Sequence, residues 1–84
     1  MERIVVRVLV FGHYRDVLPD GVLRTELPSG ATVADVARLL EARDARFADL
    51  GNRTRCAVNT DFCDSATVLR DDDEVAFLPP MSGG

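Results

Sequence analysis

The 84-residue chain has the length of one small domain, which leaves little room for an internal active-site cavity. Its net charge of −4 argues against nucleic-acid binding, because neutralising phosphates requires a surplus of cations. No apolar run approaches the roughly 20 residues of a membrane span, and the first residues lack a signal-peptide pattern, so we expect a cytoplasmic protein without membrane contact.

The first third of the sequence predicts a β-hairpin. Residues 4–11 alternate with the period of a strand, so that the even positions share one face, and Leu9 and Phe11 lie on the other. After a short connection and a turn at 19–21, residues 22–27 form the second strand.

The middle of the sequence predicts the one clear helix, over residues 32–43. Thr32 is a favourable N-cap, and Asp35 three residues later approximates a capping box. The apolar stripe of this helix consists of Val33, Val36, Ala37 and Leu40. Residues 44–54 are polar and irregular, with one helical turn expected around Phe47.

The last third predicts three further strands. Residues 55–59 form the first, and a tight turn leads into a short return segment at 62–63. We expect a single turn at 66–69. An acidic turn at 71–73 then precedes the final strand at 74–78.

This order of elements favours an α+β fold, in which one main helix packs across one face of a mixed sheet. A right-handed crossover makes the first and last strands parallel neighbours. The result is the β-grasp arrangement of ubiquitin. We assign residues 1–78 to this ubiquitin-like domain and residues 79–84 to a flexible C-terminal tail.

The tail carries most of the functional information. It consists of Pro79, Pro80, Met81, Ser82, Gly83 and Gly84. Its prolines favour a stiff, extended exit from the sheet, and its glycines lack a Cβ. Such a thin tail can thread a narrow channel in another protein and present its terminal carboxylate there.

A carboxylate is a poor electrophile, so chemistry at Gly84 requires activation. Reaction with ATP forms an acyl-adenylate, and a sulfur donor can then replace AMP to leave a thiocarboxylate. The sequence contains neither a phosphate-binding loop nor a catalytic triad, so an adenylating partner must supply the catalysis.

Several segments together carry a resemblance to a known family. They are residues 8–12, 14–16, 27–28, 30–33, 57–59 and 75–84. In these segments, and over essentially the whole chain, the sequence resembles the MoaD/ThiS sulfur carriers. The similarity is strongest to the MoaD branch, the small subunit of molybdopterin synthase.

The resemblance implies a mechanism and a set of partners. A thiocarboxylate on Gly84 would enter the active site of a large synthase subunit, in a heterotetramer. There, sulfur from two successive carriers would convert cyclic pyranopterin monophosphate into the dithiolene of molybdopterin. An E1-like adenylating enzyme, which uses ATP, and a sulfur donor protein would recharge the tail. The chain alone would be non-catalytic and would bind no cofactor tightly.

A docking patch is expected on the face of the sheet opposite the helix. If Val75 and Phe77 face the helix, Leu78 faces outward, and Phe11 does so by the same parity. Phe62 completes the predicted patch, because exposed apolar groups on a small acidic domain suggest a partner surface. The alternative is that loops cover this face. Arg15 is a further candidate contact, to an acidic partner group.

Two other features restrict the chemistry. Cys56 and Cys63 lack metal-ligand spacing and a histidine companion, so we expect no metal site and two reduced thiols. All ten basic residues are arginine, so the chain cannot link to its own side chains as ubiquitin does. The alternative functions are a sulfur carrier for thiamine or cysteine synthesis, a ubiquitin-like protein modifier, or a plain binding module.

Overall fold

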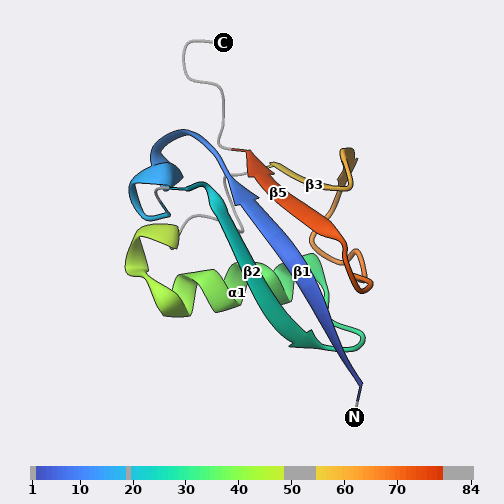
Figure 1. Cartoon of the computed structure of the whole chain (residues 1–84). Helices are drawn as coiled ribbons and strands as arrows, with labels where there is room; N and C mark the ends of the chain where they lie inside the picture. Colours follow the sequence, from blue (N-terminus) through green and yellow to red (C-terminus); the bar gives the residue numbers. More distant parts are fainter. Residues whose placement is uncertain (1, 19, 49–54, 79–84) are drawn as a thin grey trace.

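The computed structural model describes residues 2–18, 20–48 and 55–78, which form one mixed sheet and one α-helix. The strands are β1 (Arg3–Val10), β2 (Val22–Pro28), β3 (Arg55–Val58), β4 (Asp61–Cys63) and β5 (Glu74–Leu78). The helix α1 spans Val33–Arg43, and 3-10 turns occupy Gly12–Asp16 and Ala45–Phe47. α1 lies across one face of the sheet, and among the described residues the opposite face carries no α-helix (Figure 1).

The strand order β2-β1-β5-β3-β4 places the last strand at the centre of the sheet. β1 pairs with β2 in antiparallel fashion and with β5 in parallel, and the parallel register runs from Arg7↔Glu74 to Val10↔Phe77. β5 also pairs with β3, which in turn pairs with β4, both antiparallel. The predicted β-grasp fold, with its first and last strands parallel and adjacent, is therefore confirmed.

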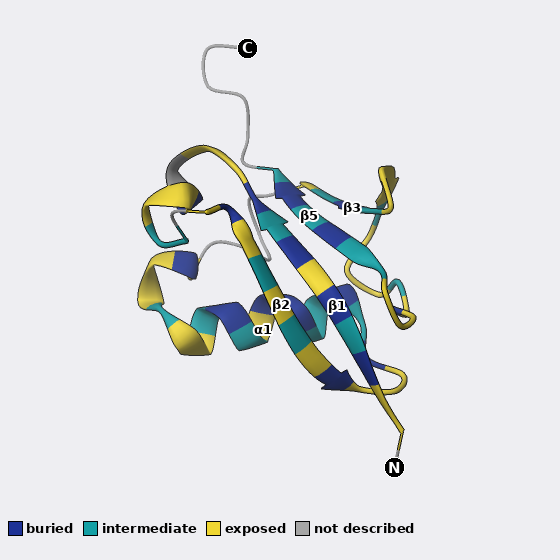
Figure 2. Ribbon diagram, in the orientation of Figure 1, coloured by how far each residue is buried: buried dark blue, intermediate teal, exposed yellow. Residues whose placement is uncertain are grey.

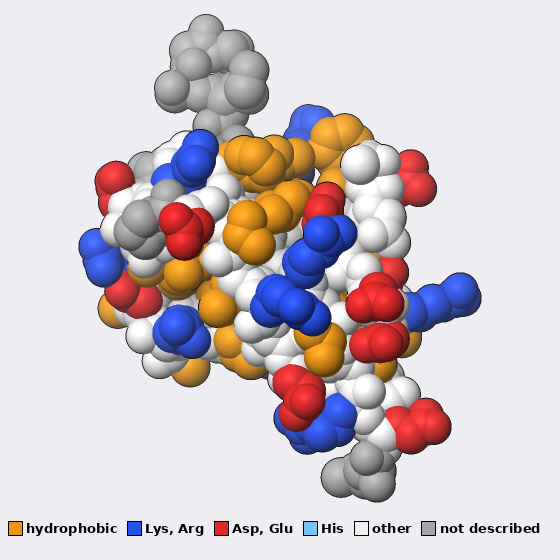
Figure 3. Space-filling model, viewed as in Figure 1, with side chains coloured by type: hydrophobic (Ala, Val, Ile, Leu, Met, Phe, Trp, Pro, Cys, Tyr) orange, Lys and Arg blue, Asp and Glu red, His pale blue; other side chains and the backbone are white. Residues whose placement is uncertain are grey.

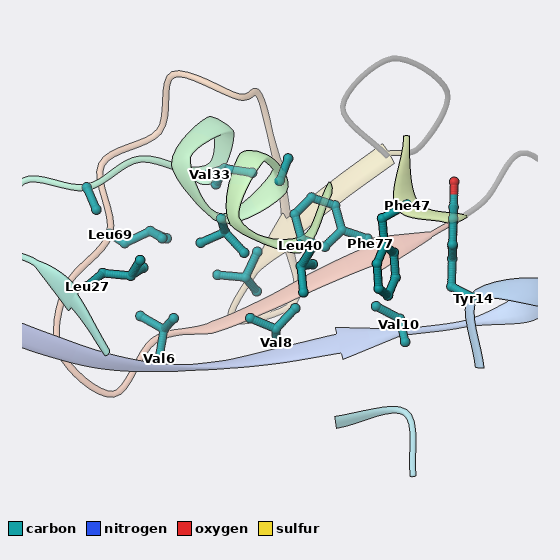
Figure 4. Packing of buried hydrophobic residues seen from close by; sticks show 14 of the residues in the cluster. Val6, Val8, Val10, Tyr14, Leu27, Val33, Leu40, Phe47, Leu69 and Phe77 are labelled. Atoms are coloured by element: carbon teal, nitrogen blue, oxygen red, sulfur yellow. The ribbon is translucent and has the colours of Figure 1, made fainter. Parts of the chain in front are cut away.

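The core lies between α1 and the sheet. Even-numbered residues of β1 point toward the helix, and alternation of buried and more exposed positions is visible along the strand (Figure 2). Figure 4 shows Val6, Val8 and Val10 below Leu40, with Phe77 beside them. The fully buried side chains are Tyr14, Phe47, Phe77, Leu40, Val6, Val8, Val10, Val33, Val36 and Val75. At one end of this core, the rings of Tyr14 and Phe47 stack with centroids 5.6 Å apart.

The N-terminus of α1 is closed by the capping box expected from the sequence. The Oγ1 atom of Thr32 accepts a hydrogen bond from the backbone N–H of Asp35, and the Asp35 carboxylate accepts one from the backbone N–H of Thr32 at 2.8 Å. That backbone hydrogen bond, assisted by the guanidinium of Arg38, lowers the pKa of Asp35. Two of the N–H groups that a helix start leaves unpaired are thereby satisfied.

The single turn expected at 66–69 lies earlier, at 65–66, where the N–H of Thr67 donates to the carbonyl of Asp64 at 3.2 Å. Val68 forms an isolated antiparallel bridge with Thr32, and the N–H of Leu69 donates to the carbonyl of Ala31 at 2.8 Å. These non-local backbone hydrogen bonds hold the segment extended, and Leu69 is buried in the core. Strand and helix ends otherwise lie within about one residue of the predictions, apart from the boundary at 49–54, which falls outside the described residues.

The acidic turn at 71–73 has a structural role. The Asp71 carboxylate accepts a hydrogen bond from the N–H of Val5 at 2.8 Å, and the Asp73 carboxylate accepts one from the N–H of Arg70 at 2.7 Å. These two hydrogen bonds therefore hold in place the turn that leads into β5. Within the described ranges, no helix is long and apolar enough to span a bilayer.

The capping box generates a stability prediction. Thr32→Ala should lower the free energy of unfolding by about 1 kcal/mol and the Tm by roughly 4–8 °C, because a helix N–H loses its acceptor. Thermal unfolding followed by circular dichroism measures this shift. Ser29→Ala, an exposed hydroxyl in the preceding turn, is the matched control and should change the Tm little. Equal losses in the two variants would contradict the capping role.

Candidate functional site

The predicted reactive tail follows directly from the central strand of the sheet. β5 ends at Leu78, and residues 79–84 lie outside the described residues. The roles assigned to Pro79, Pro80, Met81, Ser82, Gly83 and Gly84 therefore stay predictions, as does the boundary between domain and tail. The part of the site that the structure shows is the surface from which the tail departs.

The face of the sheet opposite α1 carries an apolar row that crosses all five strands. The register pairs Leu9 with Val22 on one side and with Ala76 on the other. Ala76 in turn pairs with Ala57, and Ala57 with Phe62. Because directly paired residues project from the same face, these side chains form one continuous line.

Phe11 and Leu78 extend this row toward the tail. Phe11 directly follows β1 with an extended backbone, so the alternation of the strand continues and its side chain points away from the core. Leu78 lies on the outward face of the neighbouring β5, in alternation with the buried Phe77. We call the seven residues the apolar patch: Leu9, Phe11, Val22, Ala57, Phe62, Ala76 and Leu78.

The patch is open to solvent at several points. Phe11 is 39% exposed, Val22 45% and Phe62 67%. Hydrophobic side chains gather at the end of the sheet nearest the tail, whereas charged side chains occupy the other end (Figure 3). The structure places Phe11 and Leu78 on the outward face, as their strand parity predicts, and Phe62 is exposed on the edge strand, separated from Leu78 by β3. Their role as a docking patch stays a prediction.

Arg55 lies at the margin of the apolar patch, and the sequence did not predict it as a site residue. It pairs directly with Leu78, and its guanidinium carbon lies 5.8 Å from the centre of the Phe62 ring. A cation over an aromatic face is attracted by the ring quadrupole. These two neighbours follow from the registers of β3 with β4 and with β5, which the sequence does not specify.

Arg15 lies at the opposite margin. It sits on the 3-10 turn Gly12–Asp16, and its Nε atom would be 3.3 Å from a Cβ placed on Gly21, the residue before Val22 of the patch. Gly21 has a φ of +71°, so glycine suits this close approach. Among the described residues, Arg15 makes no ion pair and stays available to a partner.

The remainder of this face is polar and internally paired. Arg7 contacts Glu74 at 3.2 Å, and Arg3 contacts Glu26 at 2.7 Å. A shallow depression there is lined by Val5, Arg7, Arg24 and Asp72. Within the described part of the chain, no group of three or more histidine, cysteine or acidic residues is placed to hold a metal ion. The described residues thus form a partly exposed apolar surface around the end of β5.

The chain matches known proteins over most of its length. The model of the ThiS family matches residues 8–84. A molybdopterin synthase sulfur carrier subunit from Mycobacterium tuberculosis is 35% identical over 80 residues, which cover 94% of this chain and 96% of the relative.

Solved structures share the fold. The Haloferax volcanii HVO 2177 protein superposes with a TM-score of 0.85 at 27% identity, covering 98% of this chain and 88% of its own. A complex of subunits 1 and 2 of the molybdopterin-converting factor from Helicobacter pylori includes a chain that matches with a TM-score of 0.65 at 21% identity, covering 96% of this chain and 100% of its own. The second likeness shows the fold alone. The family match and the curated relative together show that the chain belongs to the MoaD/ThiS family, as its sequence resemblance predicts.

Proposed function

We propose that this protein is the sulfur carrier of molybdenum cofactor biosynthesis, acting as the small subunit of a molybdopterin synthase. The family match through residue 84, together with the 35% identity to a molybdopterin synthase sulfur carrier subunit, is the observation that carries this proposal. The absence of a metal-binding cluster among the described residues is consistent with chemistry that takes place at the tail.

The proposed chemistry takes place at the Gly84 carboxylate. An E1-like adenylating enzyme joins the carboxylate to the AMP part of ATP, and pyrophosphate leaves. Sulfur from a donor protein then displaces AMP, so that one carboxylate oxygen is replaced and a thiocarboxylate remains. Within the synthase, the sulfur bonds to cyclic pyranopterin monophosphate, and water then cleaves the bond between this sulfur and the Gly84 carbonyl carbon, which returns the tail to a carboxylate.

The apolar patch is the proposed docking surface for the large synthase subunit. Leu78 and Phe11 border the root of the tail, and six extended residues reach about 20 Å beyond it. A partner that covers the patch is therefore within reach of the terminal carboxylate. Burial of Phe11, Phe62 and Leu78 would supply the apolar contact area, with Arg15 and Arg55 at the polar margins.

The alternative functions predict different modifications of the tail. Carriers for thiamine or cysteine synthesis also form a thiocarboxylate, but would not support dithiolene formation. A protein modifier would instead form isopeptide bonds with lysines of other proteins. A plain binding module would keep an unmodified carboxylate.

Intact-mass analysis tests the proposal. Incubation with the adenylating enzyme, ATP and a sulfur donor should add about 16 Da, because sulfur replaces one oxygen of the activated C-terminal carboxylate. The charged protein mixed with a large synthase subunit and cyclic pyranopterin monophosphate should then yield the dithiolene. A tail that stays unmodified, or that is recovered only as lysine conjugates, would contradict the carrier function.

Deleting Gly84 should abolish sulfur transfer and leave the Tm unchanged. The reacting carbon must lie within about 3–3.5 Å of its partner, and removing one residue withdraws it by about 3.3–3.6 Å. The assay is dithiolene formation in the reconstituted system. Gly84→Ala should be milder, because a Cβ restricts the backbone but keeps the length. Transfer by the deletion variant at the wild-type rate would exclude the tail chemistry.

Phe11→Asp and Leu78→Asp should each weaken binding to the large subunit by about tenfold or more, because a charge replaces an apolar anchor. Val68→Asp is the matched control: Val68 is 59% exposed but pairs with Thr32, at the other end of the sheet from Leu78. Binding is measured by calorimetry and folding by circular dichroism. Equal affinities of all three variants would show that the patch is not the docking surface.

A further inference from the structure

Cys56 and Cys63 form a pair of thiols on the β3–β4 hairpin. They are directly opposed in the antiparallel register, and their Sγ atoms lie 3.4 Å apart. Both cysteines are free and half-buried, and they pack against the hydrophobic core, on the side of the sheet that faces α1. The fold thus places two thiols in contact, and the proposed sulfur transfer at Gly84 uses neither of them.

The geometry of this pair suits a disulfide. Opposed residues of antiparallel strands have Cα atoms about 4.5–5.5 Å apart, inside the roughly 4.4–6.8 Å range of disulfide-bonded cysteines. An S–S bond of about 2.05 Å requires the two Sγ atoms to approach by about 1.4 Å, which rotation of the side chains can supply. The backbone pairing of β3 and β4 can therefore persist in the oxidised state.

We propose that Cys56 and Cys63 are a reversible redox site, which a low-molecular-weight disulfide such as oxidised glutathione converts into a cross-strand disulfide that ties β4 to β3. The site is separate from the patch and from the tail. It is a covalent modification site on the helix-facing side of the sheet, and it does not depend on the proposed sulfur-carrier function.

The reaction proceeds by two thiol–disulfide exchanges. The Cys63 thiol loses its proton to water, and its thiolate attacks one sulfur of the small disulfide. The S–S bond of the reagent breaks, one small thiolate leaves, and a mixed disulfide forms on Cys63. Cys56 then loses its proton and attacks Sγ of Cys63, which releases the second small thiolate. The two protein thiols are oxidised by two electrons, and the reagent is reduced to two thiols.

The environments of the two thiols favour this order. Cys63 lies on the edge strand β4, whereas Cys56 lies on β3 between β5 and β4. Burial, followed by the hydrogen bond from Cys63, raises the pKa of Cys56 to about 11. The Cys56 thiol also donates to the carbonyl of Cys63 at 3.2 Å. The raised pKa of Cys56 disfavours its thiolate, so Cys63, on the edge strand, is the attacking thiol in the first exchange.

A disulfide here would fix the most weakly held strand of the sheet. In the part of the chain that the structure describes, β4 has three residues and pairs with β3 alone, at the edge of the sheet. Its turn contains Asn59 and Thr60 with φ of +51° and +75°, and a β-branched residue is strained in this conformation. The covalent bond would therefore constrain the strand that carries the exposed Phe62 on its other face.

The experiment equilibrates the full chain with reduced and oxidised glutathione in varied ratio. Oxidation should remove both titratable thiols, lower the intact mass by about 2 Da and leave the protein monomeric. Peptide mapping should join the Cys56 and Cys63 peptides. The Tm should rise by about 10 °C, because a short loop is closed in the unfolded state. Amide exchange at 61–63 should slow.

Cys56→Ser and Cys63→Ser are the matched controls. Each keeps a single thiol, so neither should show a rise in Tm, and Cys56→Ser, which keeps Cys63, should form an adduct of about 305 Da with oxidised glutathione faster than Cys63→Ser does. Either variant suffices if the other fails to fold, since circular dichroism reports folding independently. Two thiols that stay titratable in excess oxidised glutathione, or a product that consists of adducts or dimers, would overturn the proposal. A disulfide that leaves both the Tm and the exchange at 61–63 unchanged would overturn the tying of β4.

Discussion

The parallel pairing of β1 with β5 is the constraint on which the rest of the structure depends. It brings the last strand between β1 and β3, so that the strand leading to the tail is held on both sides. Because parallel strands run in the same direction, the ends of β1 and β5 coincide, and Phe11 lies beside Leu78. One register thereby determines where the tail leaves and which side chains surround its root.

One face of the sheet forms the core that stabilises the fold, and the other face carries the surface proposed for a partner. Val6, Val8 and Val10 face α1 and are completely or almost completely buried. Smaller side chains at these positions would leave cavities, and the core of a domain of this size is small. On the opposite face, Leu9 and Phe11 point away from α1. Inward and outward side chains alternate along β1, so the outward surface can change without altering the core.

The sequence predicted the elements whose signals are local. The capping box of Thr32 and Asp35 and the alternation of β1 depend on residues a few positions apart, and both are present as expected. The outward direction of Leu78 also follows from local parity once Phe77 is buried.

Local sequence patterns did not predict the features that depend on pairing between distant segments. The contact of Arg55 with Phe62 requires the register of β3 with β4 and β5, and the bridge of Val68 with Thr32 joins segments 36 positions apart. A one-residue slip in register would send every side chain of a strand to the other face, and the local pattern alone does not select among such slips in short strands. The same limit applies to the two thiols: their spacing excluded a common metal motif, but only the hairpin register shows that they touch.

The size of the domain explains why recognition and chemistry occupy different places. A chain of this length uses its one buried layer to fold, and the described residues contain neither a buried polar or charged side chain nor a metal-binding cluster. A tail that follows the central strand gains a rigid starting point, because β5 is hydrogen-bonded on both sides. If a partner binds the apolar patch as proposed, delivery of the tail becomes effectively intramolecular, and the tail then needs little affinity of its own for the site that receives it.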